Sequence, residues 1–115
     1  AASDVYKRQV FKYAVRAMED SVRVLLKREG IDLESVNLVI PHQANIRIIN
    51  KLIDRLEVPQ SKVFINVYKY GNTSAASIPI ALDEANNKGL IAEGDTVLFC
   101  AFGGGLTWGA TLIKW

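Results

Sequence analysis

The amino-acid sequence predicts an α/β protein in which helices alternate with the strands of a mixed, mostly parallel sheet. Apolar residues recur every three or four positions over three stretches, which is the period of a helix buried on one face. Short runs rich in β-branched residues lie between these stretches, and Gly or Pro stands near their ends. The predicted order is α-β-α-β-α-β-β, and strands that alternate with helices pair in parallel through right-handed crossovers.

The first element is a helix that we expect to begin at Val10. Apolar and charged side chains are interleaved as far as Gly30, which is well placed to end the helix. Residues 1–9 are polar and have no period from which an element could be predicted. The next element is a buried strand over Val36–Ile40, which Pro41 stops.

Two further helices are expected on either side of a second strand. The first helix runs from about Gln43 to Leu56 and is apolar along one side. The strand is Val63–Val67, another run rich in apolar and β-branched residues. The last helix is Ala75–Lys88, in which Pro79 is tolerable only near the first turns, and Gly89 closes it.

The last two elements are strands over Thr96–Ala101 and Thr107–Lys114. The glycine loop between them is short, so we expect these two strands to form an antiparallel pair. Neither an internal repeat nor a low-complexity linker interrupts the chain, and we expect one domain.

Composition limits the classes of protein and site that the chain can form. Of its 115 residues 50% are hydrophobic and 23% are charged, which is typical of a globular protein and excludes disorder for most of the chain. The net charge of +2 is too balanced to indicate nucleic acid. No apolar run approaches the roughly 20 residues of a membrane span. Cys100 and His42 are the only residues of their types, so multi-cysteine and multi-histidine metal sites are excluded.

The chain begins with Ala1, and its only methionine is Met18. The residues after Ala1 are polar where the apolar stretch of a signal peptide would be needed. Processing, the way the sequence was prepared, and a cut from a longer protein would each explain this start.

Polar residues gather where three of the predicted strands end. The first strand leads into Pro41–Asn45, the second into Gly71–Ser74 and the third into Phe102–Gly105. Ligands of open α/β sheets bind outside the carboxyl ends of the strands, so these loops are expected to meet at one edge. Imidazole, carboxamide and glycine N–H groups can hydrogen-bond a carbonyl oxygen that is becoming an enolate or oxyanion. The set is typical of the stabilising half of an acyl-transfer or carbon–carbon bond-forming site.

Each of these features also has a plain structural interpretation. A lone histidine after a strand is often an ordinary loop residue, Gly-Asn is a common turn dipeptide, and three glycines can make a tight connection. Their position at three successive strand ends favours the functional interpretation.

Three longer motifs follow one another along the chain: PHQAN at 41–45, GNTSAASIP at 71–79 and AFGGGLTWG at 101–109. In sequence, order and spacing they resemble the C-terminal motifs of the β-ketoacyl-acyl-carrier-protein synthase III family. The family has the thiolase fold and starts bacterial type II fatty-acid synthesis. The resemblance covers residues 10–115 and implies part of the C-terminal half of a thiolase-like fold. Residues 1–9 do not match the family; we interpret them as an unmatched tail, for which a cloning, sequencing or assembly artefact is one explanation.

The resemblance implies a role for each matching residue. His42 and Asn72 would be the catalytic pair that holds the malonyl thioester oxygen as it becomes an enolate. Gly104 would supply an N–H of the oxyanion hole. Asn45 would line the pantetheine tunnel, and Phe102 would lie beside the catalytic centre, both in contact with substrate. A histidine paired with an asparagine fits this family rather than the elongating synthases, which use two histidines.

The resemblance also implies substrates and partners. The enzyme would condense an acyl-CoA, usually acetyl-CoA, with malonyl-acyl carrier protein. It would use no cofactor beyond the thioester groups of CoA and carrier-protein phosphopantetheine, and it would act as a cytoplasmic homodimer. Arg47 matches the arginine that docks the acidic carrier protein. Lys51 and Arg55 continue the same helical stripe, where a solvated surface is the simpler interpretation.

Cys100 is not expected to be the nucleophile of this reaction. It lies in an apolar strand, where a lone cysteine usually packs in the core. The family's nucleophilic cysteine belongs to the N-terminal half, at the start of a buried helix that lowers its pKa. The chain alone is therefore expected to be inactive in condensation.

Two other functions are compatible with parts of this pattern. The missing nucleophile, together with Asn45 and Arg47, would also suit a non-catalytic fragment or pseudoenzyme that binds acyl-CoA or carrier protein. Phosphate binding by Gly103–Gly105 is less favoured, because this loop leads into a strand and not into a helix N-terminus.

Overall fold

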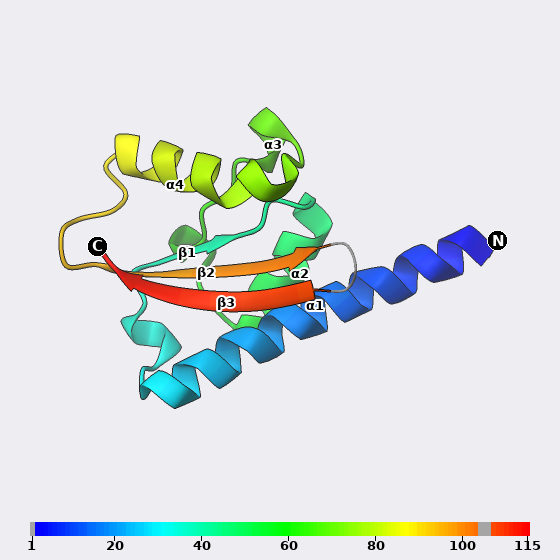
Figure 1. Cartoon of the computed structure of the whole chain (residues 1–115), viewed down its shortest axis with the longest axis horizontal. Coiled ribbons are helices and arrows are strands. Elements are labelled where there is room, and N and C mark those ends of the chain that lie inside the picture. Colours follow the sequence, from blue (N-terminus) through cyan, green and yellow to red (C-terminus); the bar gives the residue numbers. More distant parts are fainter. Residues whose placement is uncertain (1, 104–106) are drawn as a thin grey trace.

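A computed structural model describes residues 2–103 and 107–115 of the chain. Within them three strands form one sheet in the order β1-β2-β3 (Figure 1), with β1 at Leu38–Pro41, β2 at Thr96–Gly103 and β3 at Thr107–Lys114. β1 and β2 are parallel, whereas β2 and β3 are antiparallel. The predicted α/β class, the mixed sheet and the antiparallel final pair are therefore confirmed.

Helices cover both faces of the sheet and so form three layers. α1 (Ala2–Glu29) and α2 (Ile46–Leu56) pack against one face, and α4 (Ser77–Asn87) packs against the other (Figure 1). Each layer of helices therefore has its own hydrophobic core, and the sheet lies between the two cores.

Side chains of β1 and β2 alternate between the two cores. Val39 and Cys100 belong to the cluster beneath α1 and α2, whereas Leu38 and Ile40 belong to the cluster beneath α4. Successive residues of a strand point to opposite faces, and both faces of this sheet are buried. These strands are therefore continuous runs of apolar residues. The polar residues that follow the strands are thus left at the edge of the sheet.

The helix α1 begins at Ala2 and not at Val10, so the predicted start was wrong. Figure 1 shows that the N-terminal end of α1 projects beyond the sheet. Residues 7–9 are exposed there, so these three residues contribute nothing to a buried face that would impose a period on the sequence. Gly30 ends the helix as predicted, with a φ of 65°.

The predicted strand over Val63–Val67 is not formed. One bridge to Val39 joins this segment to β1, together with a hydrogen bond from the Phe64 N–H to the Val39 carbonyl oxygen at 2.9 Å. The chain then turns into the short helix α3 (Val67–Tyr70). Backbone groups of the segment bind the side chain of Gln43 in place of a neighbouring strand.

The other two helices begin slightly later than predicted. α2 begins at Ile46, because Gln43 is buried in the core and Asn45 caps the helix. α4 begins at Ser77, which leaves Pro79 in its first turn, where the missing N–H has no helical partner to lose.

No helix in the described part of the chain is long and apolar enough to cross a membrane. The remaining described helical turns are of the 3-10 type: Leu33–Ser35, Gln60–Lys62 and Ser74–Ala76.

Candidate active site

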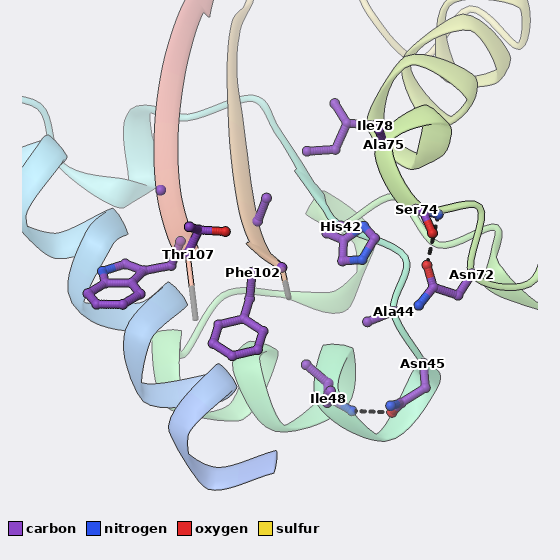
Figure 2. A pocket seen from close by; sticks show the side chains of 14 residues that line it. His42, Ala44, Asn45, Ile48, Asn72, Ser74, Ala75, Ile78, Phe102 and Thr107 are labelled. Atoms are coloured by element: carbon purple, nitrogen blue, oxygen red, sulfur yellow. Dashed lines mark hydrogen bonds between the residues drawn. The ribbon is translucent and has the colours of Figure 1, made fainter. Parts of the chain in front are cut away.

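A pocket of about 730 Å³ lies at the carboxyl ends of β1 and β2 (Figure 2). Residues of the loop after β1, the loop before α4 and the end of β2 line it, so the three polar segments do meet. Four of the predicted site residues are on its wall: His42, Asn45, Asn72 and Phe102. Gly104 lies outside the described residues, and Arg47 is not among the residues that line the pocket.

His42 follows β1 directly, and its backbone continues the sheet. Its N–H donates to the Cys100 carbonyl oxygen at 2.8 Å, which fixes the residue at the end of the parallel ladder. Figure 2 shows the imidazole on the pocket side of this loop. The side chain is half-buried, and this burial lowers the pKa of His42 below 6.5. At pH 7 the imidazole is therefore neutral and has one N–H donor and one acceptor nitrogen.

Asn72 reaches the pocket from the loop between α3 and α4. Gly71 before it has φ 67° and ψ −160°, a conformation that glycine adopts without strain. The carboxamide oxygen of Asn72 accepts a hydrogen bond from the Ser74 N–H at 3.0 Å (Figure 2). This bond occupies the oxygen and fixes the orientation of the carboxamide. The NH₂ group is the donor that Asn72 can offer to a ligand. His42 and Asn72 thus bring N–H donors to one pocket from two separate loops.

Asn45 has a structural role as well as a place on the pocket wall. Its side-chain oxygen accepts a hydrogen bond from the Ile48 N–H at 2.9 Å, which caps α2. This bond holds the exposed carboxamide in one orientation before any ligand arrives.

Aromatic rings form another part of the pocket wall. Phe102 in β2 is the cross-strand partner of Trp108 in β3, and both residues line the pocket. Tyr13 of α1 meets both rings edge-on, with centroid distances of 5.9 Å to Phe102 and 5.7 Å to Trp108. Tyr13 was not predicted from the sequence, because a helical period does not show which residues of the sheet a side chain will contact.

Cys100 lies in the core, as predicted. Its side chain is 1% exposed within the cluster beneath α1 and α2, and it does not line the pocket. Burial raises the pKa of the Cys100 thiol to about 12, so the thiol remains protonated at neutral pH. Cys100 is therefore unsuited to act as a nucleophile.

Arg47 lies on the exposed side of α2, two residues beyond the cap at Asn45. Its guanidinium carbon is 5.9 Å from the centroid of the Phe11 ring of α1, which is a cation–π geometry. The contact keeps this positive charge at the junction of α1 and α2, outside the pocket but on the helix whose first turn forms part of the wall.

Two buried polar residues behind the pocket were also missed. Gln43 is 1% exposed and Ser77 is 2% exposed, and the Gln43 N–H donates to the Ser77 hydroxyl oxygen at 2.7 Å. Both residues lie within the quoted motifs. A motif by itself does not separate residues that face the pocket from those that face the core.

The chemistry of the pocket is that of hydrogen-bond donors. In residues 2–103 and 107–115, no group of three or more His, Cys, Asp or Glu side chains could hold a metal ion. The described pocket-lining residues include no Lys, Asp, Glu or Cys. Neutral donors aimed into a partly apolar cavity can stabilise an oxygen on which negative charge develops during a reaction.

A mixed sheet between two helical layers is the arrangement of a thiolase-like fold, and His42 and Asn72 line one pocket at the strand ends. Residues 26–115 match the family described as 3-oxoacyl-[acyl-carrier-protein (ACP)] synthase III C terminal. The chain belongs to this family.

Relatives and solved structures are similar over nearly the whole chain. The β-ketoacyl-[acyl-carrier-protein] synthase III of Aquifex aeolicus is 57% identical over 108 residues, which are 94% of this chain and 35% of that protein. The enzyme of the same name from Desulfotalea psychrophila is 57% identical over 94% of this chain and 33% of its own length. The crystal structure of 3-oxoacyl-[acyl-carrier-protein] synthase III from Aquifex aeolicus VF5 has a TM-score of 0.93 at 57% identity, over 95% of this chain and 35% of that chain. The chain therefore spans about a third of the length of the curated relatives it matches.

Proposed function

We propose that this chain forms the enolate-stabilising part of a β-ketoacyl-acyl-carrier-protein synthase III, an acyltransferase that starts fatty-acid synthesis. The observation that carries the proposal is that His42 and Asn72 line one pocket, where each can offer an N–H donor. Family membership supports it, because relatives that are 57% identical bear this name.

The proposed reaction has two stages. In the first, a cysteine thiolate elsewhere in the whole protein attacks the carbonyl carbon of acyl-CoA, and CoA leaves as its thiolate. In the second, malonyl-acyl carrier protein loses CO₂, and the electron pair of the broken carbon–carbon bond forms a thioester enolate. The enolate carbon attacks the acyl-cysteine carbonyl, the cysteine thiolate leaves, and β-ketoacyl-carrier protein is the product.

His42 and Asn72 would act in the second stage. Negative charge on the thioester oxygen is greater in the transition state than in the bound substrate, so donors aimed at that oxygen accelerate the reaction. One such donor is typically worth about 3 kcal/mol. The lowered pKa of His42 suits this role, because a neutral imidazole donates a hydrogen bond without giving its proton to the carbanion.

The other residues on or near the pocket would bind and orient the substrates. Asn45 and Phe102 are proposed to contact the pantetheine arm and the acyl group, and their position on the pocket wall supports this. Gly104 is proposed to supply an oxyanion-hole N–H, as the family resemblance implies. No cofactor is proposed, because both substrates already carry an activated thioester.

The proposed macromolecular partner is an acidic acyl carrier protein that docks at Arg47. The exposed guanidinium on the first turn of α2 supports this role, since it lies on the same helix end as Asn45. We further propose that the whole protein is a cytoplasmic homodimer, as the family resemblance implies.

A second candidate is non-catalytic binding of acyl-CoA or carrier protein by the chain itself. It is favoured by one observation, the burial of Cys100, which leaves the chain without a reactive thiol for the first stage. Under this alternative, the pocket would bind a thioester ligand without turning it over.

The proposal can be tested in a full-length protein that contains this segment, with acetyl transfer from acetyl-CoA and CO₂ release from malonyl-carrier protein measured separately. His42→Ala and Asn72→Ala should each slow CO₂ release by about 100-fold, while acetyl transfer continues. Asn50→Ala is the matched control, because Asn50 is exposed on α2 and does not line the pocket. Undiminished CO₂ release in both site variants would contradict the proposal, as would an absence of condensation in the wild-type protein.

A further inference from the structure

Gln43 is buried behind the pocket, and its side chain uses all of its hydrogen-bonding capacity. The residue is 1% exposed. Its side-chain nitrogen donates to the carbonyl oxygens of Pro41 at 2.8 Å and Phe64 at 3.1 Å. Its side-chain oxygen accepts from the N–H groups of Asn66 at 2.9 Å and Val67 at 3.1 Å. Two donated and two accepted bonds are the full set for a carboxamide.

These bonds replace a strand beside β1. The segment 63–67 makes one bridge to the sheet, and the chain then turns into α3. Gln43 supplies partners for three backbone groups of this segment, which would otherwise need water or another strand. The Gln43 carboxamide therefore holds segment 63–67 next to the loop that carries His42.

Gln43 also fastens both sides of the loop that carries Asn72. On the N-terminal side, its carboxamide oxygen accepts from the N–H groups of Asn66, which precedes α3, and Val67, which begins it, and α3 leads directly into this loop. On the C-terminal side, its backbone N–H donates to the Ser77 hydroxyl oxygen at 2.7 Å, where α4 begins. Residues 71–76 are thus anchored at both ends to the neighbour of His42.

A direct action of Gln43 on substrate does not fit its surroundings. The residue does not line the pocket, and all four positions of its carboxamide are occupied by protein groups. Its contribution to the site must therefore pass through the residues that it holds.

We propose that Gln43 is a positioning residue that fixes His42 relative to Asn72, so that both N–H donors reach the same substrate oxygen. The proposal rests on the proposed function for what these two donors do. Their geometry matters because a misplacement of about 1 Å at a reacting centre can cost about 100-fold in rate.

The test compares Gln43→Met and Gln43→Glu in a full-length protein that contains this segment. Gln43→Met keeps the length of the side chain and removes its four hydrogen bonds, whereas Gln43→Glu keeps oxygen acceptors for Asn66 and Val67. CO₂ release from malonyl-carrier protein should fall about 10- to 100-fold in Gln43→Met. It should also fall in Gln43→Glu, because a carboxylate oxygen replaces the nitrogen that donates to the Pro41 and Phe64 carbonyl oxygens. Acetyl transfer from acetyl-CoA, and its KM, should stay within about twofold of the wild type.

Glu19→Gln is the matched control for the loss of a buried polar side chain. Glu19 is 6% exposed and binds Arg23 and Arg55 between α1 and α2, outside the pocket lining. Loss of folded protein lowers both rates together. Glu19→Gln should therefore lower Tm without changing the ratio of CO₂ release to acetyl transfer.

Parallel loss of both rates in Gln43→Met, or an unchanged ratio of the two rates, would overturn the proposal. If Gln43→Met does not fold, as judged by circular dichroism, the ratio in Gln43→Glu decides in the same way. If the wild-type protein does not condense its substrates, the proposed function fails, and the NMR signals of His42 and Asn72 then test the positioning alone. Signals that move in Gln43→Glu but not in Glu19→Gln support it, and signals that move in neither variant overturn it.

Discussion

His42 and Asn72 are held in the pocket by different means. The backbone N–H of His42 is bound to Cys100 in the sheet, whereas the side chain of Asn72 is bound to the Ser74 N–H within one turn. A donor at the end of a ladder is displaced only when the strands move. A donor in a turn depends on whatever holds the turn in place. Distant substitutions should therefore disturb the Asn72 side of the site more readily than the His42 side.

We expect the imidazole of His42 to titrate below pH 6.5 in the folded chain. Burial disfavours its charged form, so its pKa is lower in the folded than in the unfolded state. Between these two pKa values the unfolded chain binds more protons, so stability is lost as the pH falls below about 6.5 toward the folded-state pKa. His42 is the only histidine, so proton NMR can follow its titration without assignment. A midpoint at or above 6.5 in the folded chain would show that burial does not control this imidazole.

At the scale of single elements, the capping of α2 offers a way to separate stability from binding. Asn45→Ala removes the oxygen that accepts from the Ile48 N–H and should lower the free energy of unfolding by about 1 kcal/mol. Asn45→Asp keeps an oxygen acceptor at the helix N-terminus and should retain this stability, but it loses the NH₂ donor of the pocket wall. Urea unfolding and acyl-CoA binding measure the two effects. Weakened binding in Asn45→Ala alone, and not in Asn45→Asp, would refute a role for the NH₂ group.

A charged cluster joins α1 to α2. The carboxylate of Glu19 accepts hydrogen bonds from the Arg23 Nε at 3.0 Å and the Arg55 Nε at 2.9 Å, and Arg23 also donates to the Arg55 carbonyl oxygen at 2.9 Å. Burial by itself raises the pKa of Glu19, but the hydrogen bonds and charges of the two arginines outweigh it and lower this pKa below 4.5. The carboxylate is therefore charged in the folded chain over the whole neutral range.

We expect Glu19→Gln to lower the free energy of unfolding by about 1–3 kcal/mol at neutral pH. Because the folded-state pKa of Glu19 is lowered, its stabilisation is present above about pH 4.5 and is lost as the pH falls through the folded-state pKa. The difference between wild type and variant should thus shrink in acid, which urea unfolding at several pH values measures. Glu93→Gln is the control, because Glu93 is exposed. A difference that stays constant down to about pH 3 would speak against this linkage.

For the whole molecule, local patterns predicted most of the fold. The helical period of α1, α2 and α4 and the apolar runs of β1 and β2 report directly which faces are buried. Val63–Val67 has the apolar character of a strand, but its backbone hydrogen-bonds to the side chain of Gln43. A local sequence pattern does not reveal a bond between residues so far apart, so a strand was predicted here. The start of α1 was missed because its first turns project beyond the sheet.

The candidate site was predictable to a different extent. His42, Asn45, Asn72 and Phe102 stand at strand ends within specific motifs, and all of them line the pocket. The role of Gln43 in holding the site was not predictable, because its side chain hydrogen-bonds to residues more than twenty positions away in the chain. Motifs therefore indicated the residues at the pocket, and the structure adds the residues that hold them.

The isolated chain of 115 residues should not catalyse condensation. Its only thiol, Cys100, is 1% exposed and has a pKa raised to about 12, so the acyl-cysteine of the first stage cannot form. Purified chain mixed with acetyl-CoA and malonyl-carrier protein should yield no β-ketoacyl-carrier protein by mass spectrometry. Product formed above a no-protein blank would refute this expectation.

One consequence of the sheet concerns how the isolated chain behaves in solution. β2 pairs with β3 along the full length of β3, and no other strand pairs with β3 among residues 2–103 and 107–115. An open edge of this kind is a template on which another chain can add a strand. Trp115, beyond the end of this strand, is 40% exposed and adds apolar surface near the same edge. We therefore expect the isolated chain to associate through the edge of β3 at high concentration, and charge added on that edge should reduce this association.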